Sequence, residues 1–184
     1  MCAGYGGVRM VGIASYGAYI PFSRLSREEI GKAWGARGGA GEKAVAKFDE
    51  DSITMSVDAA LDCLRGIARN SVDGIFLATT TPPYREKMSA AVVAAALDLP
   101  RQARVADFGH SLRAATLALN SALDAVKAGS LKLVLVIAAD CRMGAPLGEF
   151  EQLFGDGAAA VLVGDTGVAA SVVASYSVHD DILD

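Results

Sequence analysis

The clearest architectural signal in the chain is one stretch, Val105-Ala-Asp-Phe-Gly-His-Ser-Leu-Arg-Ala-Ala-Thr-Leu-Ala-Leu119. It reads as a short strand that enters an apolar helix through a turn at residues 108–110. A second stretch, Phe154-Gly-Asp-Gly-Ala-Ala-Ala-Val-Leu-Val-Gly164, reads as a Gly-rich turn followed by a strand of small and branched residues. Both stretches are typical of a sheet that helices cover.

The rest of the chain extends this alternation of strand and helix. Apolar runs predict strands over 11–20, 74–78, 105–107, 131–139, 158–163 and 168–177, and helical spacing predicts helices over 52–64, 88–97 and 111–127. Ser26 is the expected N-cap of a further short helix, because Glu29 follows three residues later. Residues 164–167, Gly-Asp-Thr-Gly, predict a hairpin between the last two strands. The expected fold class is a layered α/β fold with a mixed, mostly parallel sheet.

The helix expected over 111–127 is apolar or small almost all the way round. These positions are Leu112, Ala114, Ala115, Leu117, Leu119, Ala122, Leu123 and Val126. A helix with this pattern must be covered on every side. We therefore expect a buried central helix that needs a partner surface.

Composition excludes two broad classes of protein. Of the 184 residues 52% are hydrophobic, yet no apolar run approaches the roughly 18 residues of a membrane span. The excess apolar content therefore belongs to a core or to a large protein interface. The net charge of −4 and scattered basic residues argue against a nucleic-acid binder, whose phosphate contacts need clustered Lys and Arg.

The cysteines and the first residues of the chain indicate in which cellular compartment the protein is expected. Cys2, Cys63 and Cys141 show neither metal-ligand spacing nor a disulfide framework, which suits a reducing cytoplasm. The start, Met-Cys-Ala-Gly-Tyr-Gly-Gly, lacks the charged and apolar regions of a secretory signal. We expect residues 1–9 to be a flexible extension.

Several motifs in one order resemble the thiolase superfamily, especially its archaeal-type 3-hydroxy-3-methylglutaryl-CoA synthase and ketoacyl-ACP synthase III branches. Residues 10–21 look like the first strand, and Glu42-Lys43 with Phe48–Asp51 like the segment before the second helix. Residues 133–146 look like the central strand and the loop after it, and residues 105–119 like the nucleophile turn.

The resemblance implies that residues 10–184 form one half of a thiolase-like fold, the N-terminal one. In such proteins two similar halves sandwich their central helices between two sheets, and the chain stops about where these families cross into the second half. The expectation is a half-domain whose central helix packs against another thiolase-like surface.

His110 stands where the resembling families have a cysteine that takes the acyl group. With His110 there, Leu117 falls on the family's aliphatic site and Asp107-Phe108 on its acidic-aromatic pair. Shifting the alignment to the family motif by one residue makes Ser111 the nucleophile but loses both matches. Acyl-imidazoles hydrolyse readily, so one interpretation of His110 is a histidine in a vacated active site.

Two more positions depart from the family pattern. Thr80, in Leu77-Ala-Thr-Thr-Thr-Pro-Pro-Tyr84, matches the glutamate that acts as general acid/base, and a hydroxyl cannot shuttle protons at pH 7 as a tuned carboxyl does. Arg113 replaces a small glycine. It would block the acyl space, grip a CoA phosphate or carboxylate, or make an interface contact.

The remaining candidate groups have simpler interpretations. Ser111 has no obvious base except His110 and suits a helix N-cap. Cys141 follows a core strand and is expected to be a buried structural cysteine. His179 lies beside Asp180 and Asp181, and two interpretations of these residues are open, a metal site and a solvated tail. Residues 155–157, Gly-Asp-Gly, lack the Lys and Ser/Thr of a phosphate loop.

Two functional hypotheses follow. The first is a non-catalytic thiolase-like subunit that pairs, as a homo- or hetero-oligomer, with a catalytic subunit in an acyl-CoA-handling complex. The second is an active acyltransferase, condensing or cleaving acyl-CoA thioesters with altered catalytic residues. The replaced residues favour the first, and the resemblance places the family's catalytic His and Asn in the other half. It further implies a coenzyme A thioester as substrate, no covalently bound cofactor, an OB-fold/zinc-ribbon partner and a cytoplasmic location.

Overall fold

The computed structural model describes residues 10–178, so the extension expected over 1–9 lies outside the described residues. The strands are β1 (Gly12–Tyr19), β2 (Arg24–Ser26), β3 (Glu42–Ala44), β4 (Gly74–Ala78), β5 (Arg104–Phe108), β6 (Leu133–Asp140), β7 (Gly157–Gly164) and β8 (Ala170–Ser171). The helices are α1 (Arg27–Ala33), α2 (Ser52–Cys63), the short 3₁₀ helix Arg69–Ser71, α3 (Ser89–Ala96), α4 (Ala114–Lys127) and α5 (Glu149–Leu153). No helix in this part of the chain is long and apolar enough to cross a membrane.

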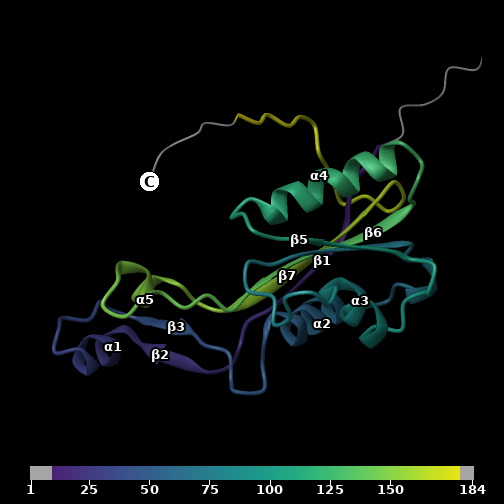
Figure 1. The fold of residues 1–184 in the computed structure, drawn as a ribbon. Helices are drawn as coiled ribbons and strands as arrows, with labels where there is room; N and C mark the ends of the chain where they lie inside the picture. The colour runs from purple at the N-terminus through teal and green to yellow at the C-terminus, as the bar shows by residue number, and fades with distance from the viewer. Residues whose placement is uncertain (1–9, 179–184) are drawn as a thin grey trace, which may run out of the picture.

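A six-stranded sheet in the order β5-β4-β6-β7-β1-β8 forms the centre of the molecule (Figure 1). Strands β5, β4 and β6 are parallel, while β7 runs antiparallel to both of its neighbours, β6 and β1. The sheet is therefore mixed, and β5, β4, β6 and β1 share one direction. This confirms the layered α/β fold with a mixed, mostly parallel sheet.

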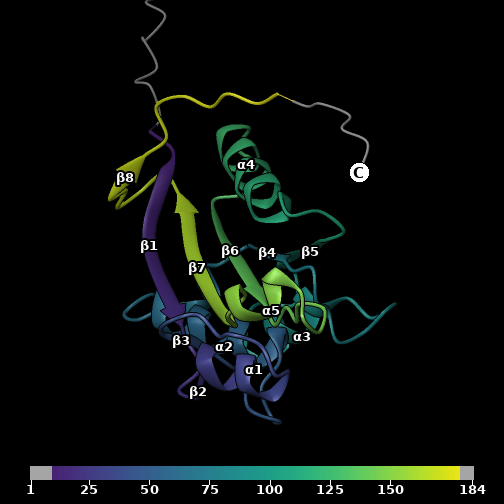
Figure 2. The same cartoon turned by 90° about the vertical axis from the view of Figure 1, so that its left-hand side faces the viewer.

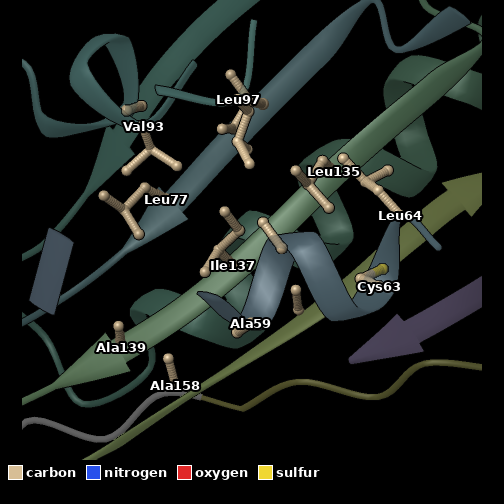
Figure 3. Packing of buried hydrophobic residues seen from close by; sticks show 14 of the residues in the cluster. Ala59, Cys63, Leu64, Leu77, Val93, Leu97, Leu135, Ile137, Ala139 and Ala158 are labelled. Atoms are coloured by element: carbon tan, nitrogen blue, oxygen red, sulfur yellow. The ribbon is translucent and has the colours of Figure 1, made fainter. Parts of the chain in front are cut away.

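Helices lie on both faces of the sheet (Figures 1 and 2). Helices α2 and α3 cover one face, where Met55, Leu77, Leu97, Leu135 and Ile137 belong to one buried cluster (Figure 3). Helix α4 covers part of the other face with a second cluster. Continuous apolar strands such as β4, buried at all five positions, are what a sheet covered on both faces requires.

Helix α4 is covered on one face only within the described residues. Ala114, Ala118, Ala122, Leu123 and Val126 face the sheet and are buried. Leu117 lies on another face of the helix and is 46% exposed, and Leu112, just before the helix, is 75% exposed. The predicted cover on every side is thus not supplied by residues 10–178.

The predicted hairpin at residues 164–167 is wrong. Strand β7 already pairs with β6 on one side and with β1 on the other, so neither of its edges is free. The chain therefore crosses to the outer edge of β1, where β8 pairs with Gly12 and Ile13. The strand expected over 168–177 is correspondingly reduced to Ala170–Ser171.

Local sequence patterns predicted the start of α1 correctly, placed the start of α4 slightly early, and did not indicate the β2–β3 hairpin or α5. Ser26 is the N-cap of α1 and accepts a hydrogen bond from Glu28 N at 3.2 Å. Helix α4 begins at Ala114, three residues later than the expected 111, because the chain first completes a turn after β5. The β2–β3 hairpin and α5 were not predicted, and they form a small lobe beside the end of the sheet (Figure 2).

Candidate active site

The site lies where three parallel strands end. Ala78, the last residue of β4, pairs with Phe108 of β5 on one side and with Ala138 of β6 on the other. Because the carboxyl ends of parallel strands meet at one edge of a sheet, the segments that follow them converge. This brings Thr79–Thr81, the turn at Gly109-His110, and Asp140 together.

His110 sits in a sharp turn between β5 and α4. Its φ is 60°, a left-handed conformation that is uncommon for residues other than glycine, although histidine is enriched there. A Cβ on the preceding Gly109 would lie 3.3 Å from the Thr79 carbonyl oxygen, so the turn is pressed against the segment after β4. The imidazole is exposed, and it hydrogen-bonds to no other residue within 10–178.

A cavity of about 260 Å³ opens beside this turn. Its wall is formed by the turn at residues 107–110 and by the loop 82–88, which carries Arg85, Glu86 and Lys87. The Lys87 ammonium lies 5.1 Å from the centre of the Tyr84 ring, within cation–π range. A cavity at the ends of sheet strands is where α/β folds place ligands.

Thr80, at the expected acid/base position, is tied to Asp140. Asp140 Oδ1 accepts from Thr80 N at 2.6 Å and from Thr80 Oγ1 at 3.0 Å. The hydroxyls of Thr79 and Thr81 donate to the same oxygen at 3.1 and 3.2 Å. The three hydroxyls thus serve to hold the turn after β4 on a carboxylate. A second, smaller cavity of about 50 Å³ lies between this turn and Ser111.

Asp107 is engaged in capping rather than free for chemistry. Its two carboxylate oxygens accept from Ser89 N and Ala90 N, each at 2.7 Å. These are the first amides of α3, whose own N-cap residue, Met88, supplies no side-chain hydrogen bond. A carboxylate at this place satisfies two unpaired helix donors and complements the helix dipole.

Ser111 lines the smaller cavity and Arg113 lines neither, and both side chains make hydrogen bonds to other parts of the chain. Ser111 Oγ accepts from Arg113 N at 3.1 Å, so it closes the turn before α4. The N-cap of α4 is Arg113, which makes no side-chain capping bond, so Ser111 is not the N-cap. The Arg113 guanidinium donates to Ser177 and Val178 and lines neither cavity.

Cys141 is a poor nucleophile in this setting. Burial raises the pKa of its thiol to about 11, and the nearby carboxylates of Asp156, Asp51 and Asp140 add to the shift. Its amide donates to Thr81 Oγ1 at 2.9 Å. A thiol with so high a pKa is almost wholly protonated at pH 7 and reacts slowly.

The two other sequence candidates are not part of this site. The turn at 155–157 is bound to the small lobe, because Asp156 Oδ2 accepts from Ala46 N at 2.8 Å. His179 lies outside the described residues. Between residues 10 and 178 no three His, Cys, Asp or Glu side chains are placed to hold a metal ion.

Sequence reasoning missed two parts of the site. Asp140 is the most connected side chain there, and its only signal was a carboxylate at the end of an otherwise apolar strand. Nothing in the sequence of the loop 82–88 indicated that it would form a wall of the cavity next to His110. Both depend on which strands become neighbours in the sheet.

The arrangement is a strand, a sharp turn and a helix, with His110 in the turn. The turn has the strained geometry that presents a side chain at the top of a sheet. Asp107 is engaged by α3 and Asp140 by three threonines, while Glu86 lines the larger cavity. The turn itself carries an imidazole and no thiol.

Comparison with known proteins relates this geometry to a family. The family described as 3-oxoacyl-[acyl-carrier-protein] synthase III matches residues 106–181, which include the turn, α4 and the strands after it. Hydroxymethylglutaryl-CoA synthase of Thermococcus sibiricus is 36% identical over 182 residues, covering 96% of this chain and 52% of the relative. The enzyme of the same name from Archaeoglobus fulgidus is 34% identical, covering 95% and 53%.

Solved structures agree on the fold. The structure of MvaS in complex with 3-hydroxy-3-methylglutaryl coenzyme A aligns with a TM-score of 0.79 and 25% identity, covering 86% of this chain and 40% of that one. A crystal structure of a 3-oxoacyl-(acyl-carrier-protein) synthase III aligns with a TM-score of 0.74 and 23% identity, covering 94% and 52%. The chain spans about half the length of the curated relatives that it matches. Residues 106–181 thus match the 3-oxoacyl-ACP synthase III family, the described residues share the thiolase-like α/β fold of these structures, and archaeal hydroxymethylglutaryl-CoA synthases are homologues at about 35% identity.

Proposed function

We propose that the chain is a hydroxymethylglutaryl-CoA synthase-like subunit without a working nucleophile, and that it supports a catalytic partner in an acyl-CoA-handling complex. The observation that carries this proposal is the occupant of the nucleophile turn. An exposed imidazole at the left-handed position stands where a thiolate is expected. Without a thiolate, the covalent acyl-enzyme of this chemistry has no stable form.

The neighbouring groups support the same conclusion. Thr80 donates its hydroxyl to Asp140, so it offers neither a carboxyl nor a free proton. Ser111 has its oxygen engaged by Arg113 N, and Asp107 caps α3. These three side chains therefore already have structural roles.

The partner is supported by apolar surface around α4. Tyr16 of β1 pairs with Val161 of β7, and Val161 packs against the α4-side cluster, so Tyr16 is on that face of the sheet. It is 78% exposed, as α4 does not reach it. A second thiolase-like surface laid against α4 and this part of the sheet would bury both. We extend the proposal to an OB-fold/zinc-ribbon protein as a further partner and to a coenzyme A thioester as the ligand that the complex handles.

Intact-mass spectrometry tests the proposal. The chain is incubated with acetyl-CoA or acetoacetyl-CoA, next to the Archaeoglobus fulgidus synthase as a positive control. We expect an acyl adduct on the control and no mass change on this chain. An adduct of stoichiometric yield on this chain would overturn the proposal, and peptide mapping would identify its site.

The second candidate function is an active acyltransferase that uses altered residues. One observation favours it, the cavity of about 260 Å³ that lies directly beside the strained His110 turn. An adduct mapped to His110, Ser111 or Cys141 would support this alternative. An adduct on another surface residue would indicate non-specific acylation and would leave the first function standing.

A further inference from the structure

The small lobe formed by the β2–β3 hairpin and α5 contains a cavity that is separate from the site at His110. The lobe lies beside the end of the sheet (Figure 2). The cavity has a volume of about 390 Å³ and lies between the hairpin and the loop 142–146. No residue of the His110 turn lines it. Pockets of this size take small organic molecules, so the cavity is a second candidate site.

Much of the cavity wall is apolar. Leu25 of β2 and Val45, just after β3, line it on the hairpin side, and Met143 and Pro146 line it on the loop side. Aliphatic and thioether side chains on opposite walls suit an apolar ligand body, which is removed from water when it enters. The lining therefore favours a ligand with an apolar chain or ring.

The loop side of the cavity is built by specific contacts to Glu151 of α5. Leu147 has a φ of 64°, an outlier for a bulky residue, and its amide donates to Glu151 Oε2 at 2.8 Å. Glu151 Oε1 accepts from Trp34 Nε1 at 3.0 Å. A Cβ on Gly144 would lie 2.1 Å from Glu151 N, so the loop touches α5 directly. Backbone outliers that the surrounding structure holds in place cluster at ligand sites.

Three of the four charged side chains in the lining are already engaged within the lobe. Both carboxylate oxygens of Glu151 accept the hydrogen bonds just described, and Asp156 Oδ2 accepts from Ala46 N at 2.8 Å. Lys43 Nζ donates to the Glu151 carbonyl oxygen at 2.6 Å. With Arg142 the lining has two cations and two carboxylates. An entering anion thus meets no excess of negative charge.

Arg142 is the fourth charged side chain, and its donors are unused. Within residues 10–178 it makes neither a hydrogen bond nor an ion pair. Its guanidinium carbon lies 4.2 Å from the centre of the Phe154 ring, a cation–π contact that restricts its orientation and leaves its N–H groups available. A planar guanidinium presents two parallel N–H donors that match the two oxygens of a carboxylate.

We propose that this cavity binds a small carboxylate with an apolar body. Arg142 holds the carboxylate, and the apolar walls around Leu25, Val45 and Met143 cover the body. The site goes beyond the proposed function and does not depend on it, because the His110 turn contributes nothing to the lining.

Trp34 fluorescence tests the site in the intact chain. Trp34 is the only tryptophan, and its hydrogen bond to Glu151 connects it to the cavity wall. Octanoate is the probe, while 1-octanol and acetate supply the apolar chain and the carboxylate separately. We expect saturable binding of octanoate, a Kd at least about tenfold higher for 1-octanol, and no saturation by acetate in the same range. Equilibrium dialysis with labelled octanoate measures the same Kd independently of the fluorescence.

Variants of the lining test which residues are responsible. Arg142→Gln should raise the octanoate Kd about tenfold, the usual effect of losing a charge-assisted contact, and Arg142→Lys should fall between, since it keeps the charge without the fork. Val45→Phe, which fills the apolar part and leaves Arg142 in place, should raise the Kd as well. Arg101→Gln, which changes an exposed arginine of another loop, is the matched control and should bind like the parent. Circular dichroism verifies that each variant is folded.

Three outcomes would overturn the proposal. The first is an absence of octanoate binding in dialysis, and the second is equal affinity for octanoate and 1-octanol. The third is an unchanged Kd in Arg142→Gln or, if that variant does not fold, in both Arg142→Lys and Val45→Phe. Failure of the proposed function has a different signature, an acyl adduct on the parent chain, which octanoate cannot form because it is not a thioester.

Discussion

His110 adopts a left-handed backbone conformation at the point where a reactive side chain would be presented to a ligand. Such residues persist where the surrounding structure over-determines them, here by the strand β5 on one side and α4 on the other. If the proposed function holds, the turn keeps the geometry that presents a nucleophile while carrying an imidazole in its place.

Restoring the family residues should therefore not restore activity. His110 is the only histidine among residues 10–178, so His110→Cys removes the one imidazole that could activate the new thiol. Thr80→Glu would add a carboxylate next to Asp140 and break a hydrogen bond that holds the turn. We expect His110→Cys/Thr80→Glu to show less than about 1% of the synthase turnover of an archaeal relative assayed in parallel, because catalytic groups act as a unit.

Replacing His110 by alanine gives the outcome that would contradict a non-catalytic role for this residue. In a native complex whose chemistry lies in the partner, His110→Ala should leave turnover nearly unchanged. A loss of about a hundredfold, roughly 2.7 kcal/mol in barrier, with assembly intact would place His110 in catalysis. The assembly is checked by gel filtration before the assay.

At the scale of elements, the ends of the helices depend on residues from neighbouring strands. Helix α2 has a local capping box, in which Asp51 accepts from Ile53 N and Thr54 N while Thr54 Oγ1 accepts from Asp51 N. Helix α3 has no such local cap and takes its cap from Asp107, eighteen residues away. The start of α3 is therefore a tertiary contact.

Asp107→Ala should lower the free energy of unfolding by about 1–2 kcal/mol, the usual effect of losing a helix cap. The reason is that the amides of Ser89 and Ala90, at the start of α3, lose their hydrogen-bond acceptor. Urea unfolding followed by circular dichroism measures it. Asp124→Ala, which removes an exposed carboxylate of α4 with no hydrogen bond among the described residues, is the control and should stay within about 0.5 kcal/mol. Equal stability of the two variants would contradict the capping role.

At the scale of the whole molecule, the described residues leave apolar surface uncovered around α4. The side of α4 away from the sheet, with Leu112 and Leu117, and Tyr16 on the sheet are the main components. Strand β5 is also an edge strand, bonded only to β4, with no proline to block pairing. We therefore expect the chain to associate with another protein chain through these surfaces.

Light scattering at micromolar concentration should accordingly show a species larger than the monomer. Leu117→Asp should shift the distribution towards the monomer, because it places a charge on the surface to be covered. Leu61→Asp changes a leucine of similar exposure, 38%, on α2 at the opposite face and should not. A monodisperse monomer of the parent chain would sink this prediction.

The amino-acid sequence by itself determined the class of fold and most element positions. Strand β4 was predicted with its exact bounds, because five consecutive apolar residues flanked by polar ones leave little choice. The order of several motifs indicated the thiolase-like family, and the comparisons agree with it, while the role of His110 stays a prediction. These features are local, since each depends on residues close together in the chain.

Tertiary structure decided the rest, for identifiable reasons. Nothing near residue 170 states that both edges of β7 are occupied, so the path of β8 to β1 required the assembled sheet. The joining of Asp140 to Thr79–Thr81 spans about sixty residues and depends on β4 and β6 being neighbours. Arg113, expected to block an acyl space, to grip a phosphate or carboxylate, or to contact an interface, donates to Ser177 and to the Val178 carbonyl oxygen, more than sixty residues away. Contacts between segments far apart in sequence carry no local pattern, and only the packed molecule shows which of them form.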